Sequence, residues 1–97
     1  MNNSQVFIEF TGISRVLTGE TEFAIPISEG TQVQDVIHMI GKKYPELVGE
    51  VIEQDGRSLI PTNLFSVNGK QILNENQLHF EPNDGDRLIL LSLLAGG

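Results

Sequence analysis

The sequence ends in Ala95-Gly96-Gly97, the segment whose residue types best suit chemistry. Glycine has no Cβ, so two glycines in a row give a chain narrow enough to pass through a tight channel in another protein. Catalytic groups of that protein can then approach the Gly97 carboxylate closely. Leu93 and Leu94 come just before Ala95 and offer the partner an apolar contact surface. We therefore predict that the Gly97 carboxylate is the reactive group; a frayed terminus without function is the alternative.

No other set of residues in the sequence has the composition of an active site. The chain has no Cys, which removes a thiol nucleophile and a thiolate metal site. Its two histidines, His38 and His79, lack a Cys or a paired carboxylate at ligand spacing, so we expect no metal site. Asp84 and Asp86 enclose a glycine, a pattern typical of turns. Ser92 has no Gly-x-Ser-x-Gly motif around it and is expected to be an ordinary strand residue.

Length and charge narrow the class of protein. At 97 residues with 39% hydrophobic content, the chain is expected to form a single domain, residues 1–97, of which 94–97 are a flexible functional tail. Phosphate backbones repel a net charge of −7, so no nucleic-acid partner is expected. The N-terminus shows no secretory signal, and the apolar run 88–95 is shorter than the roughly 20 residues of a membrane span. We therefore expect a cytoplasmic protein that does not bind membranes.

Strand patterns lie at both ends of the chain. Two early segments alternate apolar residues with others, which predicts an antiparallel hairpin with a long loop from Gly12 to Glu20. The alternating residues are Val6, Ile8 and Phe10, then Phe23, Ile25 and Ile27. Phe7 makes the other side of the first strand apolar too, which favours an interior place in the sheet. The final strand, Arg87 to Leu93, is almost continuously apolar, which favours a central strand buried on both faces.

One amphipathic helix is predicted over Val33–Tyr44, where apolar residues recur at helical spacing. Thr31 followed by Gln34 has the spacing of a capping box, and Pro45 is expected to end the helix.

The segment between this helix and the last strand carries shorter signals. They predict a helical turn over 46–52, an extended piece at 58–60, a strand at 64–67, and a tight turn at 68–70 followed by a short strand at 72–73. Leu78 and Phe80 are expected to contact the core from a loop.

The order of elements and the end of the chain resemble the MoaD/ThiS family of sulfur carriers. The resemblance is carried by Gly85-Asp86 before an apolar strand that ends in Leu94-Ala95-Gly96-Gly97, with Val67-Asn68-Gly69 and the Val33–Tyr44 helix upstream. It covers essentially the whole chain and implies an α+β, β-grasp (ubiquitin-like) fold. In that fold a mixed sheet of four or five strands has its first and last strands parallel at the centre, and one main helix packs on one face. The segment from Pro45 to Asn63 is longer than in compact ThiS-like chains, which favours a MoaD-like protein.

The resemblance also implies a protein co-substrate and not an enzyme. A ubiquitin-activating-type (MoeB/ThiF-like) enzyme would use ATP and magnesium to adenylate the Gly97 carboxylate, while this chain binds no cofactor itself. A persulfide from a sulfurtransferase would then replace AMP and leave a thiocarboxylate that donates sulfur. A MoaD-like chain would insert its tail into the larger, MoaE-like catalytic subunit of molybdopterin synthase, in molybdenum-cofactor biosynthesis.

Other functions fit the same chain end. The sulfur acceptor can instead be a thiamine precursor or tRNA, or the activated carboxylate can be joined to lysines of other proteins, as in a ubiquitin-like modifier. A noncatalytic β-grasp interaction module is a third class. This fold usually meets its partners through the sheet face opposite the helix, near Phe7 and Leu91; the alternative is that these two residues are ordinary core.

Overall fold

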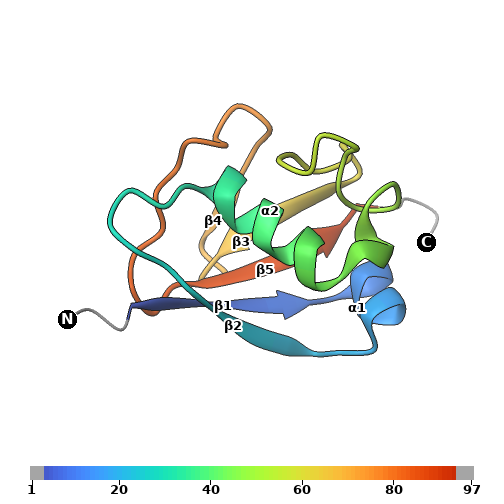
Figure 1. The fold of residues 1–97 in the computed structure, drawn as a ribbon, viewed down its shortest axis with the longest axis horizontal. Helices are drawn as coiled ribbons and strands as arrows, with labels where there is room; N and C mark the ends of the chain where they lie inside the picture. The colour runs from blue at the N-terminus through green and yellow to red at the C-terminus, as the bar shows by residue number, and fades with distance from the viewer. Residues whose placement is uncertain (1–3, 94–97) are drawn as a thin grey trace.

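The computed structural model describes residues 4–93, and they form a five-stranded mixed sheet with a long helix across one face (Figure 1). This is the predicted α+β, β-grasp architecture. The elements in chain order are β1 (Gln5–Phe10), α1 (Gly12–Thr18), β2 (Glu22–Pro26), α2 (Val33–Lys43), the 3-10 helix η1 (Pro45–Leu47), β3 (Asn63–Val67), β4 (Gln71–Leu73) and β5 (Arg87–Ser92).

The sheet has the order β2-β1-β5-β3-β4, so the last strand of the chain is its central strand. β1 and β5 run parallel, with Phe7 beside Arg87 and Phe10 beside Leu90. β2 pairs antiparallel with β1, and β3 pairs antiparallel with β5. The central position of β5 and its parallel pairing with β1 are both as the sequence predicted. Because β5 pairs with β1 on one side and with β3 on the other, and β3 pairs with it as far as Ser92, the sheet fixes the point from which the following chain starts.

The core lies between the sheet and α2. Alternation along the strands turns one side chain in two toward the helix, and the residues on that side are almost completely buried. α2 contributes the apolar face that the helical spacing predicted. The fully buried residues from the three central strands and α2 are Val6, Ile8, Phe10, Phe65, Leu88, Leu90, Val36, Ile37 and Ile40. The loop residues Leu78 and Phe80 pack against this core, as predicted.

The capping box of α2 is one residue away from the predicted position. Gln32 is the N-cap, and its backbone N–H donates to the Asp35 carboxylate at 2.9 Å. The predicted cap Thr31 instead accepts a hydrogen bond from the backbone of Ser28. The start of α2 is set from outside the helix, because the first N–H groups donate to the carbonyls of Leu78 and Phe80. A long-range contact therefore decides between two local sequence matches.

Pro45 ends α2 as predicted and also starts η1. The following segment folds back onto the helix, with Leu47 and Val51 buried. The extended piece expected at 58–60 is only a single bridge between Ile52 and Leu59.

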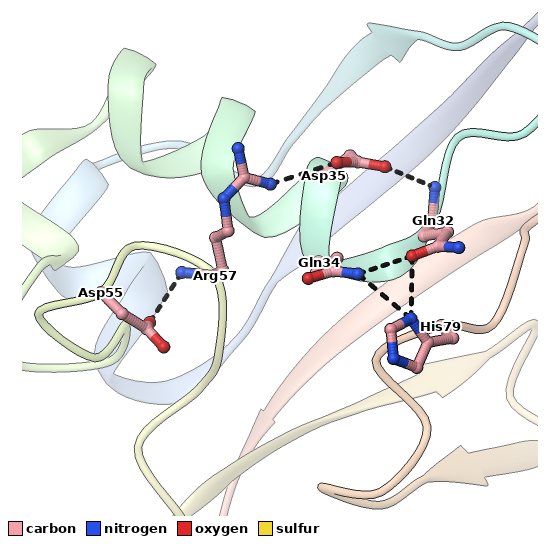
Figure 2. A network of polar contacts seen from close by, with 6 residues as sticks. All are labelled: Gln32, Gln34, Asp35, Asp55, Arg57 and His79. Carbon is pink, nitrogen blue, oxygen red and sulfur yellow. Dashed lines mark hydrogen bonds and ion pairs between the residues drawn. The ribbon is translucent and has the colours of Figure 1, made fainter.

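Ion pairing attaches this long segment to the start of α2 (Figure 2). The Arg57 guanidinium lies 3.1 Å from the Asp35 carboxylate, and the backbone N–H of Arg57 donates to Asp55. That backbone hydrogen bond is the main reason that the pKa of Asp55 lies below its ordinary value. His79 lies 3.0 Å from the Gln32 side chain at the same helix end. These polar groups pair with one another through hydrogen bonds and an ion pair, and they hold the loops against α2. We therefore assign them a structural role.

The connection between β1 and β2 is a helix, α1, and not the predicted loop. Ile13 and Leu17 lie four residues apart and pack against the core, while Ser14 is buried between them. The helix ends at Gly19, whose φ of 72° is left-handed and suits glycine.

The β3–β4 turn is clamped to the start of β5 by Asn68. Its side chain accepts from the backbone N–H of Arg87 at 2.9 Å and donates to Asp86 at 3.0 Å. Asp86 in turn accepts from the backbone of Asn83, so the Asp84-Gly85-Asp86 pattern is a turn, as predicted.

Asn68 has a φ of 57°, a conformation that asparagine tolerates better than most residues. We expect Asn68→Ala to destabilise the fold by about 1–2 kcal/mol, because it loses both hydrogen bonds and strains the backbone. Asn68→Gly keeps the backbone relaxed and should cost less. Urea unfolding of the two variants separates the contributions; equal losses would show that the backbone conformation has no part in them.

Candidate functional site

The last described residues of the chain form the root of the predicted tail. Ser92 ends β5, and the backbone N–H of Leu93 donates to the carbonyl of Thr62 at 2.6 Å. The Leu93 side chain is 54% exposed. The predicted tail residues Leu94, Ala95, Gly96 and Gly97 lie outside the described part of the chain. The structure therefore places the point from which the tail starts, at the end of the central strand.

The sheet face opposite α2 is apolar around the same strand. Leu91 and Phe7 both point away from the helix, and both are half-buried and outside the core. Leu64 lies directly opposite Leu91 on β3, and Ile72 on β4 is 52% exposed. We call Phe7, Leu64, Ile72, Ile89 and Leu91 the outer face.

Burial of β5 on both faces was predicted, and this prediction is wrong within residues 4–93. Leu88 and Leu90 are buried under α2, whereas Ile89 and Leu91 are half-exposed on the outer face. The unbroken apolar pattern of the strand has two causes, since one side faces the core and the other is an apolar surface. Exposed apolar area of this kind marks contact sites on many proteins.

Charged residues of β1, β2 and β5 lie on the same side of the sheet, next to Phe7. The Arg87 guanidinium lies 5.6 Å from the ring centre of Phe7 and pairs with Glu22 and Glu9. The hydrogen bond from Arg87 to Glu22 is the main reason that the pKa of Arg87 lies above its ordinary value. Arg87 is thus a fixed positive charge over an aromatic ring, with two carboxylates beside it. A partner that covers Phe7 meets this set of charges.

A mostly apolar hollow within residues 4–93 does not resemble a catalytic site. It has a volume of about 390 Å³ and lies between α2, the segment at 58–61, β3 and the loop after β4. Glu75 is the only ionisable residue along its wall. Within residues 4–93, no group of three acidic, histidine or cysteine side chains is placed to hold a metal ion. None of the described helices is long and apolar enough to cross a membrane.

Sequence reasoning missed most of the outer face. It named Phe7 and Leu91 but not Leu64, Ile72 or Ile89. Leu64 and Ile72 are in short strands whose alternation is interrupted by Ser66 and by the turn, so the sequence gives no clear face for them. Only the pairing register shows that Leu64 lies opposite Leu91, and that Ile72 lies opposite Ser66, the partner of Ile89.

A mixed sheet that packs against one main helix, with the last strand of the chain at its centre, defines the ubiquitin-like fold. A sequence model of the ThiS family matches residues 8–97. The chain therefore belongs to the ThiS family, as its sequence predicted. No curated protein matches the chain.

Solved structures with the same fold come from several archaea. SAMP1 from Haloferax volcanii superposes with a TM-score of 0.80 at 19% identity, covering 96% of this chain and 99% of that one. The small archaeal modifier protein 1 (SAMP1) from Methanosarcina acetivorans has a TM-score of 0.78 at 24% identity and covers 97% of each chain. A putative molybdopterin converting factor, subunit 1, from Pyrococcus furiosus has a TM-score of 0.73 at 24% identity, covering 94% of this chain and 99% of that one. At these identities the similarity establishes the fold.

Proposed function

We propose that this protein is a cytoplasmic sulfur carrier whose Gly97 carboxylate is converted to a thiocarboxylate. The proposal is carried by one observation, namely that β5, the central strand, delivers the chain end from a rigid position beside an apolar outer face. Membership of the ThiS family supports it. The absence of cysteine fits as well, since no thiol of the chain competes with the terminal sulfur.

The chemistry requires catalysts from partner proteins. An adenylating enzyme of the ubiquitin-activating type binds ATP and magnesium; the Gly97 carboxylate attacks the α-phosphorus, and pyrophosphate leaves. A persulfide on a sulfurtransferase then attacks the acyl carbon and displaces AMP. The product is an acyl disulfide that joins the chain to the sulfurtransferase. A second thiol of the donor attacks that disulfide, so that a protein disulfide forms and the thiocarboxylate is released. This chain's own residues bind the partners and hold the tail in place.

Among sulfur acceptors we favour the molybdopterin precursor. The long segment from Pro45 to Asn63 and the similarity to the Pyrococcus furiosus converting factor subunit both support this choice. The protein would then be the small, noncatalytic subunit of molybdopterin synthase and insert its tail into the larger MoaE-like subunit.

Intact mass spectrometry of the protein from its native host tests the proposal. We expect a fraction of the molecules to carry the mass increase of one oxygen replaced by sulfur, and the fraction to change with molybdenum-cofactor demand. Lasting absence of that species would contradict a sulfur carrier. A sulfur-loaded form that does not respond to the demand for molybdenum cofactor would point to thiamine or tRNA as the acceptor.

Protein modification is the second candidate, and the similarity to two SAMP1 structures favours it. A lysine amine would attack the same acyl-adenylate, so that AMP leaves and an isopeptide bond forms. Immunoblots of host lysates distinguish the two functions, because only a modifier gives higher-mass conjugates that disappear when Gly97 is deleted.

Leu91→Glu tests whether the outer face binds the partners. Leu91 is half-buried on the outer face and opposite Leu64, so a carboxylate there is placed next to an apolar neighbour in the expected contact. We expect binding to the adenylating enzyme to weaken at least about tenfold, as measured by calorimetry. Met39→Glu is the matched control, because Met39 is a 36% exposed apolar residue on α2. Equal effects of both changes would show that the outer face has no special role.

A further inference from the structure

The short helix α1 carries a strongly exposed apolar residue. Val16 is 80% exposed, the highest value among the large hydrophobic residues of the described chain. Its neighbours Ile13 and Leu17 pack against the core and fix the orientation of the helix. A single exposed valine does not by itself indicate a binding site. The position of this valine on α1 is the reason to consider one.

α1 lies against the end of β5, where the predicted tail starts (Figure 1). Thr11, which precedes the helix, donates a hydrogen bond to the carbonyl of Leu90 at 2.6 Å. A Cβ added to Gly12 would come within 3.1 Å of the Ser92 Cβ, so the helix touches β5 at its last residue. Val16 follows Gly12 by four residues, which is about 6 Å along the helix axis. Val16 thus lies one helical turn beyond the contact with Ser92.

The length of the tail limits how far away a partner can be. Residues 94–97 span at most about 14 Å when fully extended. An enzyme that holds the Gly97 carboxylate in its active site must therefore come within about 14 Å of Leu93. Its surface then lies close to the end of the sheet where α1 packs against β5. The two exposed apolar side chains at this end, Val16 and Leu93, are the contacts available there.

We propose that Val16 is a docking residue for the adenylating enzyme, which covers it with an apolar surface at the entrance to the channel that receives the tail. This inference rests on the proposed function and adds to it. Val16 contacts the enzyme from α1 while Leu93 contacts it from the root of the tail. Together they set the direction in which the tail enters, so that productive binding needs both the outer face and α1.

Val16→Ser tests the inference in an adenylation assay with the full chain and the adenylating enzyme from the same host. Pyrophosphate release is measured as a function of carrier concentration. We expect KM to rise about tenfold with kcat nearly unchanged, because an interaction present in both the ground state and the transition state is lost. Val16→Ile keeps the apolar contact and should retain the wild-type KM. Met39→Ser, on α2, is the control for loss of an exposed apolar side chain elsewhere.

The outcomes separate this inference from the proposed function. Wild-type adenylation with an unchanged KM for Val16→Ser overturns the role of Val16 and leaves the carrier function intact. A rise in KM that is equally large for Met39→Ser also overturns it. If the wild-type protein is not adenylated at all, the proposed function fails and the inference fails with it. Circular dichroism confirms that the exposed substitutions leave the fold unchanged.

Discussion

Phe10→Ala is expected to destabilise the protein by about 3–5 kcal/mol. Phe10 is only 1% exposed and lies on the helix side of the sheet, between β2 and the end of α2. Its ring stacks on Phe23 with 5.6 Å between ring centres and meets the edge of Tyr44 at 5.3 Å. Removing it leaves a cavity among rigid neighbours and breaks both aromatic contacts. The loss is comparable to the whole stability of many small domains, about 5–15 kcal/mol.

Equilibrium unfolding in urea measures this effect, with Phe7→Ala as the matched control. Phe7 is on the same strand but points to the outer face, where it is half-exposed beside Arg87. Its removal leaves no enclosed cavity and should cost about 1–2 kcal/mol. A loss for Phe10→Ala no larger than that for Phe7→Ala would contradict the assignment of the core to the helix side of the sheet.

The fold was predictable from the sequence wherever periodicity is strong over a sufficient length. The alternation in β1 and β2 and the helical spacing in α2 each involve several apolar residues, and their burial dominates the local energetics. The apolar run of β5 correctly indicated a central strand. These four elements already define a sheet with one covering helix, so the fold class follows from them.

α1 was missed because its signal is short. The pair Ile13 and Leu17 has helical spacing and Gly19 is a suitable helix end, but seven residues that include Gly12 and Ser14 read equally well as a polar loop. What makes the segment a helix is its packing against the core and against β5, which is a tertiary contact.

The candidate site was predictable in part, for a related reason. A residue pattern can show that Leu91 and Phe7 are apolar, but not whether another layer covers them. Only the topology shows that α2 covers one face and leaves the other open, and only the strand register adds Leu64 and Ile72 to that open face. The tail was predicted from residue type alone, because its proposed chemistry depends on a narrow chain and a carboxylate and not on packing.

Deleting Gly97 is expected to lower the rate of adenylation at least about 100-fold, because the new carboxylate on Gly96 falls about 3.4 Å short of the position at which ATP is attacked. The end of β5 cannot supply the missing length without losing the pairing of Ser92 with Asn63 on β3. The outer face and α1 are unchanged by the deletion, so binding to the adenylating enzyme should weaken much less than turnover. Pyrophosphate release measures the first quantity and calorimetry the second.

Gly97→Ala is the control of unchanged length. It keeps the carboxylate in place and adds one Cβ, so it tests whether the channel requires a narrow chain. We expect a smaller loss than for the deletion, mainly in kcat. Formation of the sulfur-loaded species by the deletion variant at the wild-type rate would show that the Gly97 carboxylate is not the reactive group. A deletion variant that keeps its cellular function without forming that species would instead indicate a noncatalytic β-grasp interaction module, which acts through its surfaces alone. Because the deletion leaves every described contact of residues 4–93 in place, the result bears on the tail and not on the stability of the fold.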